Sequence, residues 1–103
     1  MSSNDFLHMD GKKTALVIHR DDNVAITLAD VRAGDECRIR EENGREYALK
    51  AVDDIAFGHK IALADIGRDK PVLKYGEEIG KMKEPVARGG WIHSHNLYCE
   101  RGM

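Results

Sequence analysis

Residues 36–52 read ECRIREENGREYALKAV, and this stretch decides the expected fold. Asn43-Gly44 lies at its centre, and this dipeptide is the strongest short signal for a β-hairpin turn. Apolar and polar residues alternate on both sides of the turn, which is the pattern of half-buried strands. We therefore predict an antiparallel hairpin that pairs residues 36–40 with residues 45–51. The residues expected to share one face of their strand are Cys37 and Ile39 on the first strand, and Tyr47, Leu49 and Ala51 on the second.

Short apolar runs bounded by turn residues continue on both sides of this hairpin, and no window shows a sustained helical period. Glycines recur at intervals of about 8–12 residues or less, which favours an all-β fold over an α/β fold. At most one or two short helices are expected, at 29–33 or 53–57. No internal repeat or linker is apparent. The other segments expected to be extended are 14–19, 24–28, 60–66, 72–76 and 77–82.

The chain has 103 residues, a length that predicts a single domain. We assign this domain to residues 13–98, with a flexible N-terminal lead-in at 1–12 and a C-terminal tail at 99–103. Sixteen basic and eighteen acidic residues leave a formal net charge of -2. This balance argues against a protein that binds nucleic acid through a basic surface.

The compartment is expected to be the cytoplasm. No apolar run approaches the roughly 18 residues of a membrane-spanning helix, and no secretory signal opens the chain. Cys37 and Cys99 show neither CxxC nor zinc-finger spacing, so we expect reduced thiols.

The stretch GGWIHSHN at 89–96 holds the first candidate site. If residues 91–95 are extended, Trp91, His93 and His95 share one face, and the two imidazoles can act on one substrate or metal ion. Asn96 can add an amide donor or a carbonyl acceptor. The alternative is a polar, solvent-exposed strand end without a function, and the residues by themselves leave both interpretations open.

A second candidate site lies at Gly58-His59-Lys60, where a turn leads into an apolar run. Side chains at such transitions often contact ligands, and Lys60 can neutralise a carboxylate. His19 ends another apolar run and can join the same cluster. A solvated loop is the competing interpretation for all three residues.

Several segments in a fixed order resemble a known family, namely the SAF domain, a small β-clip module, of altronate and galactarate dehydratases. The resemblance covers about residues 14–98. The segments that carry it are DNVAIT (22–27), VRAGDE (31–36), FGHKIALADI (57–66), VLKYGEEIG (72–80) and PVARGGWIHSHN (85–96).

The resemblance implies a compact all-β domain of β-clip type. It also implies a sugar-acid dehydratase, a hydro-lyase that removes water from hexonates, aldarates or hydroxy acids such as sulfolactate. Because the chain ends at Met103, the expected form is a separate small subunit that completes the active site of a large catalytic subunit. A divalent metal such as iron or manganese is expected in the assembled enzyme.

The resemblance also suggests roles for individual residues. His93, His95 and Asn96 match an HxHN segment of altronate-type members, which galactarate-type members replace, and His59 and Lys60 match a GHK segment. We expect His93 and His95 to be catalytic or to bind metal. The residues expected to bind substrate are His59, Lys60, Asn96 and Arg88.

Two other functions remain open from the sequence. The chain can be a non-catalytic SAF module that binds carbohydrate or assembles with a protein partner. It can also be a metal-binding protein that uses His93, His95 and His59. Neither nucleic acid nor a membrane is an expected partner, and the isolated chain is expected to be able to pair with a second copy.

Overall fold

The computed structural model describes residues 13–99, and within this range the chain forms short β-strands and no helix. The expected lead-in at 1–12 and most of the expected tail, 100–103, lie outside the described residues. The all-β prediction is confirmed. The strands are β1 (Lys13–Leu16), β2 (Val24–Thr27), β3 (Glu36–Arg40), β4 (Glu46–Lys50), β5 (Lys60–Ala62), β6 (Pro71–Lys74), β7 (Glu77–Met82), β8 (Trp91–Ile92) and β9 (Leu97–Tyr98).

Six of these strands form one sheet, in the order β4-β3-β1-β2-β5-β8. Its outer hairpin is the predicted one: β3 and β4 are antiparallel, with Cys37 opposite Leu49. Gly44 has the positive φ, 89°, that such a turn requires and that glycine adopts without strain. The Asn43 side chain accepts a hydrogen bond from the Arg45 N–H at 2.9 Å. The alternating sequence and the turn residues therefore determine this hairpin locally.

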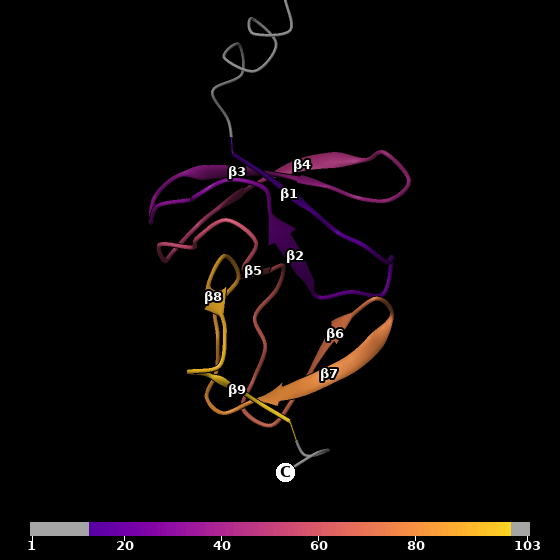
Figure 1. The fold of residues 1–103 in the computed structure, drawn as a ribbon, viewed down its shortest axis with the longest axis vertical. Helices are drawn as coiled ribbons and strands as arrows, with labels where there is room; N and C mark the ends of the chain where they lie inside the picture. Colours follow the sequence, from indigo (N-terminus) through magenta and orange to yellow (C-terminus); the bar gives the residue numbers. More distant parts are fainter. Residues whose placement is uncertain (1–12, 100–103) are drawn as a thin grey trace, which may run out of the picture.

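The remaining strands form a smaller sheet in the order β6-β7-β9, at the opposite end of the molecule from β1, β3 and β4 (Figure 1). The apolar core has two parts accordingly. Ile39, Ile55 and Ile61 are fully buried in the first part, and Val72 and Met82 in the second.

The buried carboxylate of Asp22 ties the β6–β7 hairpin to the rest of the domain. It accepts hydrogen bonds from three backbone N–H groups: those of His19 (3.0 Å), Tyr75 (3.1 Å) and Gly76 (2.8 Å). A carboxylate bonded by several N–H groups forms strong, charge-assisted links. The smaller sheet is thus anchored by a polar contact as well as by apolar packing.

Contrary to the expectation from the sequence, the chain contains an internal repeat. Four ten-residue segments adopt the same path: a bend, an isolated bridge at the fifth residue, a tight turn, and the start of a strand at the tenth residue. The eighth residue has positive φ in each segment: Gly34 (94°), Gly58 (85°), Asp69 (64°) and Gly89 (89°). The segments are TLADVRAGDE (27–36), AVDDIAFGHK (51–60), ALADIGRDKP (62–71) and MKEPVARGGW (82–91).

The repeats associate in two pairs, the first with the second and the third with the fourth. Bridges join Val31 to Ile55 and Ile66 to Val86, all four of which are buried. In both pairs, the N–H of the first residue of each repeat donates to the carbonyl of the partner's ninth residue. The N–H of each eighth residue donates to the carbonyl of the partner's first residue. Each pair therefore has approximate two-fold symmetry.

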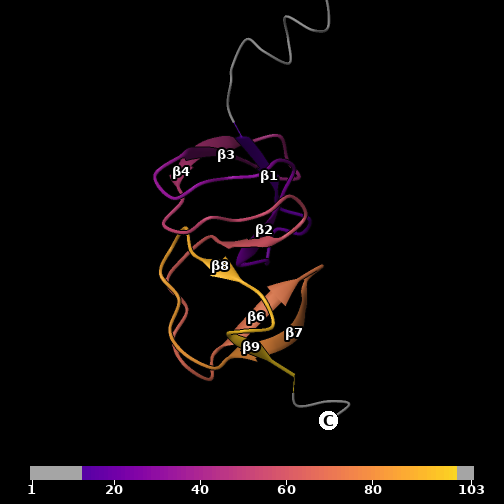
Figure 2. The ribbon, with the colours of Figure 1, turned by 60° about the vertical axis from the view of Figure 1, so that its left-hand side comes forward.

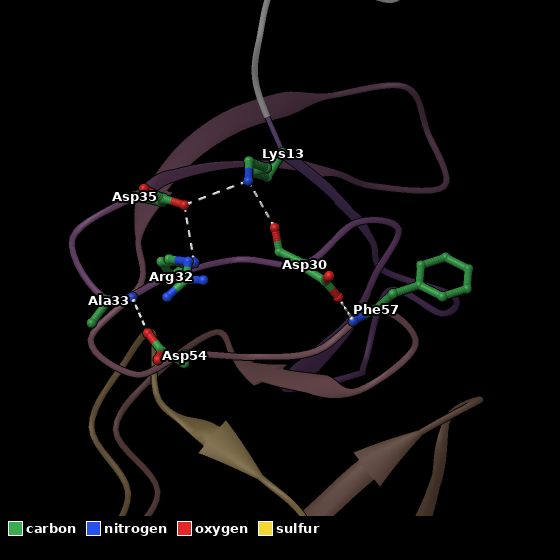
Figure 3. A network of polar contacts seen from close by, with 7 residues as sticks. All are labelled: Lys13, Asp30, Arg32, Ala33, Asp35, Asp54 and Phe57. Atoms are coloured by element: carbon green, nitrogen blue, oxygen red, sulfur yellow. Dashed lines mark hydrogen bonds and ion pairs between the residues drawn. The ribbon is translucent and has the colours of Figure 1, made fainter.

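Aspartates at the fourth position of the repeats reinforce the pairing. Asp30 accepts a hydrogen bond from the Phe57 N–H, and Asp54 reciprocally accepts one from the Ala33 N–H, both at 2.9 Å (Figure 3). In the second pair Asp65 accepts the corresponding bond from the Arg88 N–H at 2.8 Å, whereas proline occupies the equivalent position 85. The expected helices at 29–33 and 53–57 do not form, because these segments pair with each other across the bridge.

Repeat pairing also determines which strands of the sheet follow the second and fourth repeats. The second leads into β5 and the fourth into β8, and these two strands pair antiparallel, with Lys60 opposite Ile92 and Ile61 opposite Trp91. Figure 2 shows β8 between the two ends of the molecule. The GHK and GGWIHSHN segments, far apart in the sequence, therefore lie side by side.

Candidate functional site

The candidate site begins where β8 ends. We expected residues 91–95 to be extended, but β8 contains only Trp91–Ile92, and residues 93–96 form a turn. The carbonyl of His93 accepts hydrogen bonds from the N–H groups of Asn96 (3.0 Å) and Leu97 (2.9 Å). The prediction of an extended HxH strand was therefore wrong. A turn, and not strand periodicity, orients the two histidines.

Trp91 and three imidazoles nevertheless gather into one group, which we call the histidine–tryptophan cluster: His59, Trp91, His93 and His95. The His59 and His93 rings are stacked, with centroids 4.6 Å apart and planes at 21°. The Trp91 ring lies 5.7 Å from His93 and 4.5 Å from His95. His93 and His95 thus both lie against the Trp91 ring. His93 also lies against His59 of the GHK segment.

Asn96 lies beneath the cluster and holds the turn together. It is 5% exposed. Its side-chain carbonyl accepts a hydrogen bond from the His93 N–H, and its amide donates one to the Trp91 carbonyl, both at 2.9 Å. Both polar ends of the side chain are used within the turn, so the geometry supports a role in placing the histidines.

The electrostatics of the cluster favour the neutral form of His93. His93 has an exposed side chain, but partial loss of hydration and then the nearby His59, Lys60 and His95 lower its pKa below the ordinary value of 6.5. Burial lowers the pKa of Lys60 from its ordinary value of 10.5, and the nearby Lys74 lowers it further. A neutral imidazole beside a cation is suited to accepting a proton from an anionic substrate.

The other predicted residues lie elsewhere. Arg88 donates its Nε–H to the Leu63 carbonyl at 3.1 Å and its backbone N–H to the Asp65 carboxylate at 2.8 Å. His19 accepts a hydrogen bond from the Asp21 N–H at 3.1 Å and packs against Gly76, beside the β6–β7 hairpin. The structure therefore unites His59 with His93 and His95, and separates His19 from them.

The described residues contain no group of three or more His, Cys, Asp or Glu side chains that could hold a metal ion. A stable zinc-type site needs three or four protein ligands. His93 and His95 by themselves therefore do not make a complete metal site. Residues 13–99 also contain no helix able to span a membrane.

Trp91 and Lys74 belong to the surroundings of the site, and the sequence assigned neither of them a role in it. Trp91 was expected on the histidine face, but not as the ring that joins the histidines; its being the chain's single tryptophan was the available signal. It also borders an open groove over the first repeat bridge, which Asp30, Arg32 and Asp54 line as well. Nothing in the sequence indicated that Lys74 lies near Lys60.

The chain is similar to altronate dehydratases and to the alpha subunit of a sulfolactate sulfo-lyase. It is 40% identical over 79 residues to an altronate dehydratase of Escherichia coli, an alignment that covers 77% of the chain and 15% of the relative. It is 34% identical over 84 residues to an altronate dehydratase of Bacillus subtilis, covering 82% and 16%. It is 38% identical over 65 residues to the alpha subunit of a (2R)-sulfolactate sulfo-lyase of Paracoccus pantotrophus, covering 63% and 96%.

The chain thus spans about a sixth of the altronate dehydratases but matches nearly the whole of the sulfo-lyase subunit. The family model described as the altronate/galactarate dehydratase SAF domain matches residues 13–100. The chain belongs to the altronate/galactarate dehydratase SAF domain family.

Proposed function

We propose that the chain is the small subunit of a lyase that acts on a hydroxy acid, and that its histidine–tryptophan cluster completes the active site of a separate large subunit. The observation that carries the proposal is the convergence of the GHK and HSHN segments on one exposed cluster. The sulfo-lyase relative supports it, because a protein named as a subunit corresponds over 96% of its length to this domain.

The proposed reaction is the elimination of water from a 2,3-dihydroxy acid. A base removes the proton α to the carboxylate, the electron pair forms the C2–C3 double bond, and hydroxide leaves C3 with a proton from a general acid. The resulting enol then becomes the 2-keto-3-deoxy product. His93 is the proposed base, because its pKa is held below the ordinary value and its side chain is exposed. His95, whose ring lies against that of Trp91 with centroids 4.5 Å apart, is the proposed second catalytic group.

Substrate binding is assigned to the cations and donors beside these histidines. Lys60 starts β5, opposite Ile92, and its charge reaches His93. It is proposed to bind the substrate carboxylate, with His59 as a hydrogen-bond donor. A divalent metal such as iron or manganese is assigned to the large subunit, because the residues described here do not form a metal site. No step above depends on it. We place the assembled enzyme in the cytoplasm.

The test is co-expression with a large dehydratase subunit from the same source, followed by assays for loss of water from altronate and galactarate. Loss of sulfite is assayed for sulfolactate, whose C3 carries a sulfonate in place of a hydroxyl. His93→Ala is expected to lower kcat by about 10²–10⁴-fold, the usual contribution of a general base, and His95→Ala to lower it as well. His19→Ala is the matched control, because His19 lies outside the cluster. Full activity of both the His93 and the His95 variants would remove the histidines from the mechanism.

A non-catalytic assembly module is the second candidate, and Phe57 favours it. This side chain is 64% exposed, two residues before His59, and it points away from the polar network of the first repeat pair (Figure 3). If the cluster serves only assembly, histidine variants weaken subunit association or raise KM and leave kcat intact. Comparing kcat at saturating large subunit therefore separates the two functions.

A further inference from the structure

The indole N–H of Trp91 donates a hydrogen bond to Nδ1 of His59 at a donor–acceptor distance of 3.1 Å. A neutral imidazole carries one proton, on either Nδ1 or Nε2, and the unprotonated nitrogen is the acceptor. Because Nδ1 of His59 is the acceptor here, the proton of the neutral ring is on Nε2. The hydrogen bond with Trp91 therefore selects the tautomer of His59.

The His59 ring is also held in place by its surroundings. Its plane is stacked on His93 at 4.6 Å. Its backbone belongs to the turn of the second repeat, where its N–H donates to the Ala56 carbonyl at 3.0 Å. Its own carbonyl accepts from the Thr27 N–H at 3.0 Å and from the Thr27 hydroxyl at 3.2 Å. A 180° flip of the ring would put Cδ2 in the place of Nδ1 and would break the bond to Trp91.

Trp91 is itself anchored on both sides of its backbone. Its N–H donates to the Asp53 carboxylate at 2.9 Å, and its carbonyl accepts from the Asn96 amide at 2.9 Å. It is also paired with Ile61 across the β5–β8 ladder. The indole N–H of Trp91 is therefore held in a fixed place relative to β5, the strand that directly follows His59. A group that positions another side chain must be held in this way.

We propose that Trp91 is a positioning residue that holds His59 as a fixed Nε2–H hydrogen-bond donor. The arrangement withdraws His59 from two other roles. Nδ1 cannot bind a metal ion while it accepts the indole proton, and a protonated Nε2 has no lone pair for a metal or for a substrate proton. Histidines that bind metals show the opposite pattern, because their second nitrogen donates to a carbonyl or carboxylate. That a substrate oxygen accepts a hydrogen bond from His59 Nε2–H rests on the proposed lyase function. The hydrogen bond between Trp91 and His59 does not depend on that function.

Nuclear magnetic resonance of the ¹⁵N-labelled chain at about pH 8, above the ordinary imidazole pKa, tests the assignment directly. We expect a scalar coupling across the hydrogen bond between Trp91 Nε1 and His59 Nδ1, and nitrogen shifts typical of unprotonated Nδ1 and protonated Nε2. A protonated His59 Nδ1, or no coupling to the indole nitrogen, would overturn the proposal.

Trp91→Phe tests the same bond by removing the N–H while keeping an aromatic ring. In this variant the His59 nitrogen shifts are expected to move toward the average of two exchanging tautomers. His19 is the control within the same spectrum, because its Nδ1 accepts from the Asp21 N–H and makes no contact with Trp91 in the described structure. His59 shifts that stay at their wild-type values would refute the positioning role. A variant that does not fold leaves the wild-type coupling as the deciding measurement.

Kinetics of the assembled enzyme then distinguish this proposal from the proposed function. Trp91→Phe is expected to lower kcat/KM by about two- to tenfold, the range that one neutral hydrogen bond supports. If the coupling is present and the kinetics are unchanged, Trp91 positions His59 but the lyase does not use it. If the coupling is absent, the positioning role fails whatever the kinetics show.

Discussion

Replacing Asn96 with alanine is expected to destabilise the domain and to disorganise the candidate site at the same time. The substitution removes two hydrogen bonds of 2.9 Å, one from the His93 N–H and one to the Trp91 carbonyl. Each such bond contributes about 0.5–1.5 kcal/mol net, so the expected loss in the free energy of unfolding is about 1–3 kcal/mol. With a urea dependence of about 1–3 kcal/mol per molar, the midpoint of unfolding should fall by about 1 M.

Asn23→Ala is the matched control for this experiment. The Asn23 side chain also makes two backbone hydrogen bonds, one to the Pro71 carbonyl at 3.0 Å and one from the Leu73 N–H at 2.8 Å. These bonds hold β6 against the loop before β2, away from the cluster. The two variants should therefore lose similar stability by the same mechanism.

Tryptophan fluorescence separates the local effect from the global one, because Trp91 is the only tryptophan in the chain. Asn96→Ala should change the emission of the folded state, since the turn that places His93 and His95 against the indole is released. Asn23→Ala should leave that emission unchanged. An unaltered urea midpoint for Asn96→Ala, or equal spectral changes in both variants, would show that Asn96 does not organise the site.

Three further predictions concern the turns, the titration of the cluster and the buried thiol. Gly89→Ala should abolish or severely weaken folding, because φ is 89° and an added Cβ would collide with a β4 carbonyl; Gly44→Ala, also at φ 89° but with open space around it, should cost only about 1 kcal/mol by urea unfolding. His93 should titrate in NMR below 6.5, so that its contribution to stability is complete above that pH and is lost as the pH falls through its lower folded-state pKa; Lys60→Gln should raise the midpoint, and an unchanged one would contradict the assigned cause. Burial and a nearby carboxylate raise the pKa of Cys37 to about 11, so iodoacetamide should modify it only after unfolding, as mass spectrometry of labelled peptides can show; rapid labelling of the native chain would refute this.

The internal repeat could not be recognised from the sequence. Its four copies share a buried Val or Ile at the fifth residue and a turn residue at the eighth, where Asp69 replaces the usual glycine. Three copies also share an aspartate at the fourth residue, but the other positions vary. They also start at irregular intervals along the chain. Most of their common structure consists of backbone hydrogen bonds between paired copies, which almost any side chain permits. For the same reason, residues 29–33 and 53–57 could not be distinguished from short helices.

Local sequence by itself was sufficient for the all-β class, the hairpin around Asn43-Gly44 and the segments that identify the family, because alternation, turn chemistry and residue order act over short distances. The tertiary structure decided how the site is assembled. It paired β5 with β8, ended β8 at Ile92, and placed His59 against His93 and Trp91. The physical reason is that contacts between residues about thirty positions apart depend on how the repeats pair, and no local pattern encodes that pairing.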